Sequence, residues 1–339
     1  MEHELLYRIG LVAIAVFGTF ALTCAVMKVL LPRLRKYKLN QPISEYAPKT
    51  HLGKASTPTL GGLSFVVAST VVFLLLLIPF FISGQGKTVL PLVFSFGLAL
   101  CNTAIGLFDD YIKLTKKHNI GLRAWQKFVL QLLFAAIYLV LMVLFGGVTT
   151  AIHIPFFDVT LDLGIFTYVI AILIITGIIN STNLTDGVDG LLSSTAAVVA
   201  CFFLALAFLR ESTVGVILPA LVLGSVLAFL IYNAHPAKVF MGDTGSLFIG
   251  ALFVGTAFLL DEPLIVLIAG GIYVVETASV ILQVLSCKLI RIGWRKTRLF
   301  RRTPIHHHFE DGGYTETQVV VSFTLVSVIF CLLALLGVL

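Results

Sequence analysis

The sequence predicts an all-α polytopic membrane protein with about ten transmembrane helices. Of its 339 residues, 58% are hydrophobic and only 12% are charged, and the mean hydropathy is +1.04. A soluble domain has roughly 25% charged residues, so this chain has too little polar surface to coat a globule in water. The apolar residues also form runs close to the roughly 20 residues that a membrane-spanning helix requires. These observations exclude a soluble globular fold.

Ten hydrophobic runs mark the expected helices, which we assign to one transmembrane domain over residues 1–339. They cover Ile9–Leu31, Leu60–Ile82, Val89–Phe108, Phe128–Phe145, Leu163–Ile179, Leu191–Leu209, Val214–Tyr232, Leu247–Leu260, Pro263–Leu285 and Val319–Leu339. The eighth run is short for a membrane span. We expect Gly245 and Ser246 to lengthen it by a turn.

Lysine and arginine residues concentrate in alternate connections between these runs. The first, third and ninth connections hold most of them: Arg33, Arg35, Lys36, Lys38, Lys49 and Lys54; Lys113, Lys116, Lys117, Arg123 and Lys127; and Lys288, Arg291, Arg295, Lys296, Arg298, Arg301 and Arg302. The positive-inside rule therefore places the odd-numbered connections in the cytoplasm and both termini outside. The formal net charge of +6 reflects this topology, anionic lipid and an anionic substrate, and we expect no nucleic-acid partner.

Two connections predict structure of their own. Between Gly146 and Asp162, two short β-prone stretches flank Pro155, which predicts a small β-hairpin on the outer, periplasmic side. Residues 289–302 mix Ile, Trp and Phe with Arg and Lys, which predicts an amphipathic helix on the cytosolic surface, with a plain basic linker as the alternative. The five cysteines lie in or at the ends of spans without paired spacing, so we expect neither a disulfide nor a zinc site.

Paired acids follow the third span at its cytosolic end. Asp109 and Asp110 are adjacent, and neighbouring carboxylates at a membrane boundary repel each other unless a cation or a metal ion holds them. Asp109 and Lys113 are four residues apart and share a helix face, so an ion pair at the helix end is the simpler alternative. That ion pair accounts for only one of the two acids.

Two further cytosolic motifs combine acids with Asn, Gly and Thr. Residues 180–190 have the sequence NSTNLTDGVDG, and residues 233–246 have the sequence NAHPAKVFMGDTGS. Each motif leads into a helix, and a helix N-terminus favours phosphate. Their carboxylates suit Mg²⁺, which prefers one or two carboxylates together with substrate oxygens. Helix capping is the alternative, but it accounts for one acid of the first motif and hardly for the whole run.

A histidine run completes the set in the segment PIHHHFE at residues 304–310. Three consecutive histidines cannot all face one metal ion from a helix or a strand, which argues against a zinc site. Donation to phosphate or sugar oxygens fits their chemistry better. Metal-binding oxygens, phosphate-binding loops and bases together indicate phosphoryl transfer. Their position at the membrane surface indicates a lipid-linked substrate.

These four motifs, in this order across ten spans, resemble those of the polyprenyl-phosphate N-acetylhexosamine-1-phosphate transferases. The histidine run, with Lys54 and the segment TPTLGG at residues 57–62, is similar to the phospho-N-acetylmuramoyl-pentapeptide transferase branch. The resemblance implies Mg²⁺-dependent transfer of phospho-MurNAc-pentapeptide from UDP-MurNAc-pentapeptide to undecaprenyl phosphate, giving lipid I and UMP for peptidoglycan synthesis. It also implies a bacterial plasma-membrane location, with the active site on the cytoplasmic face.

The resemblance also implies roles for individual residues. Asp243 matches the metal ligand, Asp109 matches the candidate base that acts on the lipid phosphate, and Asp110 supports the same catalytic site. The nucleotide-binding positions are matched by Asn183, Asp186, Gly187, Asp189 and Phe240, with Phe240 stacking on uracil. Further polar substrate contacts are matched by Lys54, Thr59, Lys113, Lys127, Asn233, His306, His307 and His308.

Two other functions remain open from the sequence. A transporter would hold several charged residues near the bilayer midplane, where we place only Glu276. Glu276 shares a helix face with Ser279 and Gln283, and a polar contact between helices is the simpler interpretation of that face. A transferase with UDP-GlcNAc as donor would keep the reaction and change the sugar. The small residues between Gly245 and Gly255 would permit a homodimer.

Overall fold

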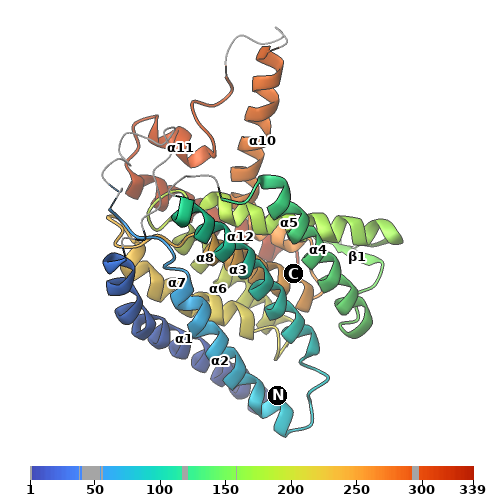
Figure 1. Ribbon diagram of the computed structural model, residues 1–339. Helices are drawn as coiled ribbons and strands as arrows, with labels where there is room; N and C mark the ends of the chain where they lie inside the picture. Colours follow the sequence, from blue (N-terminus) through green and yellow to red (C-terminus); the bar gives the residue numbers. More distant parts are fainter. Residues whose placement is uncertain are drawn as a thin grey trace.

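The structure is a computed structural model that describes residues 2–37, 39, 54, 56–116, 121–157, 159–291 and 298–339. These residues form a bundle of helices with one two-stranded sheet (Figure 1). The helices are α1 (Glu2–Lys36), α2 (Leu63–Ile82), α3 (Leu90–Lys116), α4 (Ala124–Phe145), α5 (Ile165–Thr185), α6 (Leu191–Leu209), α7 (Ile217–Asn233), α8 (Asp243–Leu259), α9 (Ile265–Ala269), α10 (Gly271–Arg291), α11 (Ile305–Glu310) and α12 (Glu316–Leu336). The strands are β1 (Ala151–Ile154) and β2 (Val159–Asp162).

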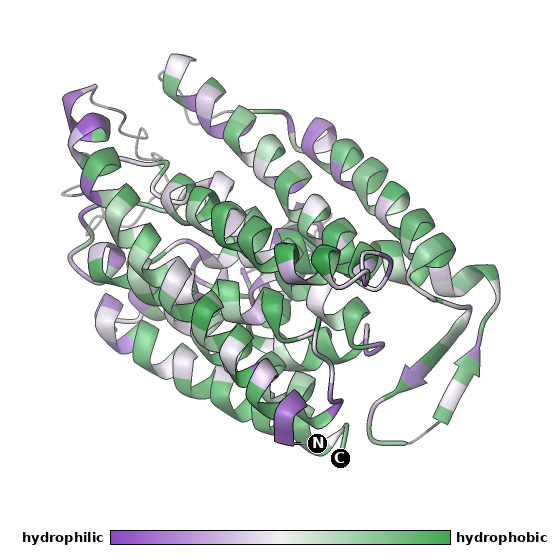
Figure 2. Cartoon of the chain, turned by 90° about the horizontal axis from the view of Figure 1, so that it is seen from below, coloured by the Kyte–Doolittle hydropathy of each residue, from purple (hydrophilic) through white to green (hydrophobic). Residues whose placement is uncertain are grey.

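The helix lengths confirm the predicted membrane fold. Within the described part of the chain, eight helices are long and apolar enough to cross a membrane, and α7 and α8 are shorter apolar helices. Most residues along the helices are hydrophobic, as the green ribbons of Figure 2 show. Many large apolar side chains on the outer helices are exposed; Leu74 and Leu75 of α2, for example, are each 58% exposed. Such continuous apolar surface is unusual for a soluble monomer and suits contact with lipid.

The outer end of the bundle, which carries the β-hairpin, also holds both ends of the described chain. In the hairpin, Ala151 pairs with Asp162 and Ile154 with Val159, in antiparallel register. Nδ1 of His153 lies 2.9 Å from a carboxylate oxygen of Glu262, which also pairs with Arg210. The backbone N–H of Phe156 donates to the carbonyl of Gly337 at 2.9 Å. The predicted hairpin is therefore confirmed, and it is tied to the C-terminal helix.

The ninth predicted helix is broken near its start. The run Pro263–Leu285 forms α9 and α10, separated at Gly270. A β-carbon on Gly271 would lie 2.6 Å from the ring of Phe330, so glycine is needed where α12 packs against this break. The hydropathy is continuous across the break, which is why the sequence pattern did not reveal it.

Helix α10 then projects past the inner end of the bundle (Figure 1). The hydroxyl of Thr277 donates to that of Ser181 at 2.7 Å, and Ser181 lies in the last turn of α5. The neighbouring Glu276 therefore lies near the inner end, and its expected midplane position is wrong. The amphipathic helix predicted at 289–302 falls mostly on 292–297, outside the described residues; α10 is helical to Arg291, and residues 298–302 are not helical.

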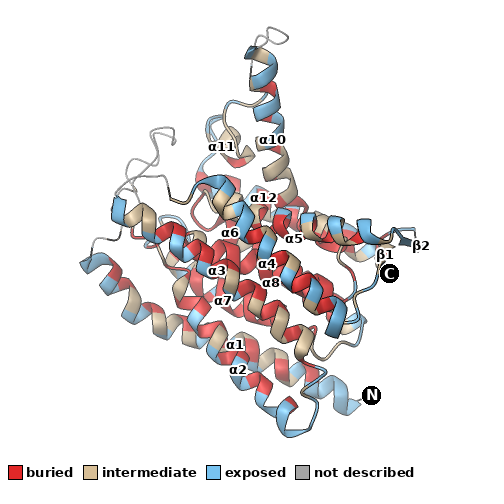
Figure 3. Cartoon of the chain, turned by 45° about the vertical axis from the view of Figure 1, so that its right-hand side comes forward, coloured by how far each residue is buried: buried red, intermediate tan, exposed pale blue. Residues whose placement is uncertain are grey.

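Helix α8 lies at the centre of the bundle (Figure 3). Every residue from Thr244 to Phe258 is buried, and the helix packs against α2, α3, α5, α6 and α7. Its small residues face these neighbours: β-carbons on Gly245 and Gly255 would each lie 2.7 Å from side chains of the same chain, Phe65 and Ser95. The small-residue face of α8 is therefore used inside the bundle and is not available for the homodimer contact that the sequence suggested.

Candidate active site

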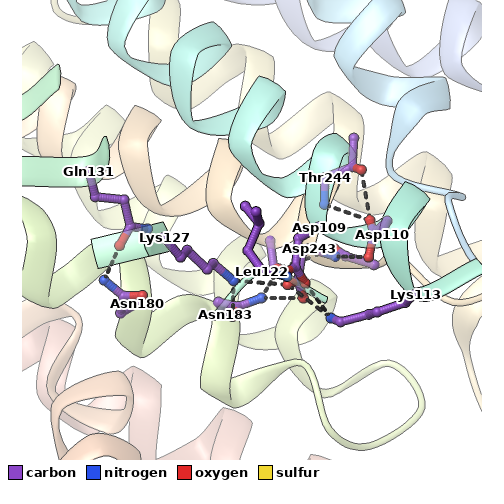
Figure 4. A network of polar contacts seen from close by, with 12 residues as sticks. Asp109, Asp110, Lys113, Leu122, Lys127, Gln131, Asn180, Asn183, Asp243 and Thr244 are labelled. Atoms are coloured by element: carbon purple, nitrogen blue, oxygen red, sulfur yellow. Dashed lines mark hydrogen bonds and ion pairs between the residues drawn. The ribbon is translucent and has the colours of Figure 1, made fainter. Parts of the chain in front are cut away.

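Three carboxylates meet where the inner ends of α3 and α8 cross (Figure 4). One oxygen from each of Asp109, Asp110 and Asp243 lies within 4.8 Å of the others. The two helices can approach this closely because position 106, one turn before Asp109, is glycine: a β-carbon there would lie 2.7 Å from the backbone nitrogen of Thr244. Close helix packing thus brings together acids that are far apart in the sequence. We call Asp109, Asp110 and Asp243 the carboxylate cluster.

Asp243, the first residue of α8, is the most heavily contacted member of the carboxylate cluster. Its Oδ2 accepts from the ammonium groups of Lys127 at 2.8 Å and Lys113 at 3.1 Å. Its Oδ1 accepts from the amide of Asn183 at 2.9 Å. Lys113 comes from α3, Lys127 from α4 and Asn183 from α5. The structure therefore places three other residues of the predicted site around the carboxylate of Asp243.

Asp109 and Asp110 are adjacent but have different partners. Asp109 pairs with Lys113 at 2.6 Å, as its helical spacing predicts, and accepts from the backbone N–H of Leu122 at 2.7 Å. Asp110 accepts from both the backbone N–H and the hydroxyl of Thr244, at 3.0 and 2.8 Å. A carboxylate that accepts hydrogen bonds from the first N–H groups of a helix caps that helix, and the positive end of the helix dipole stabilises its negative charge. Asp110 therefore caps α8 from another helix, a role that the sequence did not reveal.

The carboxylate cluster has the donor chemistry of a magnesium site. Mg²⁺ is a hard cation that is bound by carboxylate oxygens and keeps further positions for water or substrate phosphates. Two ammonium groups already converge on Oδ2 of Asp243, which shows that this position favours positive charge. The residues present therefore fit the predicted ion.

A second polar cluster joins the motif at 180–190 to the start of α12. The ammonium of Lys54 lies 2.8 Å from Asp189 and 2.6 Å from Glu316. The other oxygen of Asp189 lies 3.2 Å from Nδ1 of His235 and accepts from the backbone N–H of Ala237 at 3.0 Å. Lys54 and Asp189 are predicted site residues, whereas Glu316 and His235 are not. No sequence pattern marks Glu316 or His235 as a site residue: Glu316 follows a threonine that caps α12, and His235 precedes a proline. Only their proximity in the structure connects them to the site.

Asn233 and Thr59 occupy enclosed positions beside these clusters. The amide of Asn233 accepts from the backbone N–H of Gly190 at 3.0 Å and donates to the carbonyl of Val239 at 3.1 Å. Asn233 therefore links the motif at 180–190 to the motif at 233–246 by hydrogen bonds. The hydroxyl of Thr59 is buried without a hydrogen-bond partner among the residues that the structure describes, and a β-carbon on Gly242 would lie 3.0 Å from it.

Phe240 is held by the segment that follows Lys54. Its backbone N–H donates to the carbonyl of Pro58 at 2.8 Å, and its carbonyl accepts from the N–H of Gly61 at 2.9 Å. Its side chain is partly exposed, three residues before Asp243. The backbone of Phe240 is therefore fixed three residues before Asp243, and the residue is not fully buried.

The three histidines have three separate partners. Nδ1 of His306 lies 3.0 Å from Glu276, and Nδ1 of His307 lies 2.7 Å from Glu310. His308 accepts from the backbone N–H of Arg301 at 3.1 Å. His306 is the only one of the three that is buried, and it lies against Gly187 of the motif at 180–190.

Asp186, in the connection after α5, has a raised pKa. Burial raises the pKa of its carboxyl from 3.8 to about 8, and the negative charges of Asp243, Asp110 and Asp189 act in the same direction. The side chain keeps partial solvent exposure, which moderates the effect on stability. An unfolded chain loses this proton near pH 4 and the folded chain near pH 8, so the folded state becomes less stable as the pH rises between those values.

We predict that Asp186→Asn, which cannot ionise, raises the melting temperature more at pH 8 than at pH 5.5. The measurement is thermal unfolding of both proteins in metal-free buffer at the two pH values. A shift of equal size at both pH values would contradict the prediction.

Comparisons with known proteins agree with the geometry. The sequence profile of glycosyl transferase family 4 matches residues 91–261. The phospho-N-acetylmuramoyl-pentapeptide-transferase of Clostridium botulinum (strain Alaska E43 / Type E3) is 40% identical over 321 residues, covering 94% of both chains. The proteins of the same name from Bacillus thuringiensis (strain Al Hakam) and Heliobacterium modesticaldum (strain ATCC 51547 / Ice1) are 42% and 43% identical, covering 94% and 91% of both chains. With this similarity over nearly its whole length, the chain belongs to the phospho-N-acetylmuramoyl-pentapeptide transferase family of membrane enzymes in peptidoglycan synthesis.

Proposed function

We propose that this enzyme transfers phospho-MurNAc-pentapeptide from UDP-MurNAc-pentapeptide to undecaprenyl phosphate, giving lipid I and UMP, on the cytoplasmic face of the membrane. The observation that carries the proposal is the carboxylate cluster with Lys113 and Lys127, at the inner end of α3 and α8. A reaction between two phosphate-bearing substrates needs both cations and carboxylates at one point. The position at the helix ends suits an acceptor that stays in the bilayer.

The chain's own residues account for most of the chemistry. A Mg²⁺ ion held by Asp243, with Asp109 and Asp110 beside it, would offset the charge of the donor pyrophosphate. Lys113 and Lys127 donate to phosphate oxygens as the reaction proceeds. Asp109 orients the acceptor phosphate and accepts its remaining proton; a phosphate monoester is largely ionised at pH 7, so orientation is the larger part of this task. The acceptor oxygen bonds to the sugar-linked phosphorus, and the bond from that phosphorus to the UMP oxygen breaks.

Asp110 supports this site without touching the reacting atoms. Its hydrogen bonds to Thr244 hold the first turn of α8 and thereby the direction of the Asp243 carboxylate. Asn183 fixes the other oxygen of that carboxylate. Catalysis that depends on orientation needs such rigid supports.

The nucleotide binds, in this proposal, between Phe240 and the cluster of Lys54, Asp189 and Glu316. Stacking of an aromatic ring on a base contributes roughly 1–3 kcal/mol, which is about a fivefold to hundredfold change in affinity. Phe240→Ala is therefore expected to raise the KM for the UDP donor by that factor and to leave the KM for undecaprenyl phosphate nearly unchanged. Steady-state kinetics with each substrate varied in turn measure both values.

Phe240→Trp serves as the matched control, because any flat ring can stack on the base. It is expected to keep the donor KM within a few-fold of wild type. If Phe240→Ala instead weakens the lipid acceptor, or lowers stability with an unchanged donor KM, the ring only packs against the protein. The base-binding surface would then lie nearer Asn183 and Asp189.

Purified protein supplied separately with UDP-MurNAc-pentapeptide and UDP-GlcNAc tests the donor. We expect a lipid-linked product and UMP from undecaprenyl phosphate with the first donor only. If product formed with UDP-GlcNAc and not with UDP-MurNAc-pentapeptide, the transferred sugar would be GlcNAc and the proposed donor would be wrong. Absence of any product, in protein that still binds Mg²⁺, would overturn the proposed transfer.

A further inference from the structure

Glu276 of α10 is a fully buried carboxylate whose side chain contacts His306. Its side chain and that of His306 are both 0% exposed. Oε1 of Glu276 lies 3.0 Å from Nδ1 of His306, and Oε2 lies 3.5 Å from the backbone nitrogen of the same histidine. Burying a carboxylate is costly unless hydrogen bonds compensate it. Here both oxygens are directed at donors of a single residue, which fixes that residue at two points.

The other side of the His306 ring faces the donor-binding motif. Nε2 is buried and has no hydrogen-bond partner within the described parts of the chain. A β-carbon on Gly187 would lie 2.7 Å from Cε1 of the ring, so the imidazole occupies the space that a side chain at position 187 would need. Gly187 follows Asp186 directly and lies two residues before Asp189. A continuous line of contact therefore runs from Glu276 through His306 to the connection at 186–190.

A second anchor on the same helix face supports this arrangement. The side-chain oxygen of Gln283, about two turns along α10 from Glu276, accepts from the backbone N–H of Phe300 at 2.9 Å. The polar face that the sequence suggested for a contact between membrane helices thus holds the segment that leads into the histidine run. Glu276 and Gln283 attach this segment at two places.

We propose that Glu276 is a positioning residue for the transfer reaction: through His306 it sets the position of the 186–190 connection and so the affinity for the nucleotide donor. This inference rests on the proposed function. Because the carboxylate accepts from Nδ1, the proton of the neutral ring stays on that nitrogen and the ring orientation is fixed. Nε2 is then the atom directed at the donor-binding connection, and Gly187 is the residue that rests on the ring.

Glu276→Gln tests the inference with little change in size. One amide group of glutamine would face a donor of His306, so the ring loses one of its two attachments. We expect the dissociation constant and the KM for UDP-MurNAc-pentapeptide to rise about tenfold, while the KM for undecaprenyl phosphate stays within twofold. Calorimetry gives the binding constant without turnover. Ser279→Ala is the matched control, since that hydroxyl donates to the backbone carbonyl of Glu276, at 2.6 Å, and not to its carboxylate; wild-type constants are expected.

A double mutant separates positioning from simple stabilisation. If Glu276 acts only through His306, Glu276→Gln adds less than twofold to the donor constant in a His306→Gln background. Nitrogen chemical shifts of labelled histidine report whether Nδ1 keeps its proton in wild type and loses that preference in Glu276→Gln. Equal donor affinity in wild type and Glu276→Gln, or full additivity in the double mutant, would overturn the inference. Tight donor binding by wild type without turnover would count instead against the proposed function.

Discussion

Asp243→Asn is expected to reduce transfer to less than about a hundredth of the wild-type rate while leaving the protein folded and extractable. The amide keeps the size of the carboxylate but loses the charge that Mg²⁺ requires. It also replaces an oxygen that lies 2.8 Å from Lys127 and 3.1 Å from Lys113. Removal of one preorganised electrostatic contact typically costs 10²–10³ in rate, and this change removes several. Initial rates of UMP release and thermal unfolding curves measure the two properties.

Asp261→Asn is the control for the same chemical change. Asp261 is exposed, lies in the connection after α8 at the outer end, and has a φ of 57°, which asparagine tolerates. We expect wild-type turnover from this variant. A rate above a tenth of wild type for Asp243→Asn would contradict the assignment of the metal ligand.

Gly106→Ala is expected to lower the rate by more than about a hundredfold, although position 106 carries no functional group. The new β-carbon would lie 2.5 Å from the carbonyl carbon of Asp243 and 2.7 Å from the nitrogen of Thr244. Backbone atoms cannot rotate away from it, so α8 has to move relative to α3. A displacement of about 1 Å at reacting groups can cost 10²-fold in rate. Turnover and the affinity for Mg²⁺ are the quantities to measure.

Gly97→Ala, on the same helix, is the matched control. A β-carbon at position 97 meets nothing within 4 Å, so it has space at this helix surface. We expect unchanged activity and unchanged or slightly higher stability, since alanine favours helix more than glycine does. Equal losses from both substitutions would show that α3 tolerates no added side chain at all, and the explanation from close packing at position 106 would then be wrong.

Much of the fold could be predicted because a bilayer imposes strong rules on sequence. Long apolar runs and the distribution of Lys and Arg are read locally, and they indicated the spans and the end of the bundle that carries the chemistry. The break at Gly270 was missed because it depends on the distance between α10 and α12 and not on hydropathy. The shared end of the hairpin and the C-terminal helix likewise depends on contacts between distant segments, such as Phe156 with Gly337.

The sequence predicted which residues belong to the candidate site better than it predicted how they contact one another. Asp109, Asn183 and Asp243 each lie where a helix meets the inner surface, so the topology alone brings them to one side. Apart from the pair of Asp109 and Lys113 within α3, the contacts between these side chains could not be predicted, because they follow from how the helices pack. Asp110 as a cap for α8 and Glu276 as the partner of His306 are examples, because each pairing joins residues of different elements.

Helix α8 has a further consequence for the depth of the reaction within the bilayer. With 17 residues it is about 26 Å long, which is shorter than the roughly 30 Å of a hydrocarbon core. A lipid-facing helix of this length would have to thin the bilayer around it, but α8 is enclosed by other helices and escapes that constraint. Its polar first turn, which begins at Asp243, therefore does not have to reach the level at which the longer helices α3 and α5 end. In the proposed transfer, this would let the acceptor phosphate reach Asp109 and Asp243 without its long isoprenoid tail having to leave the membrane.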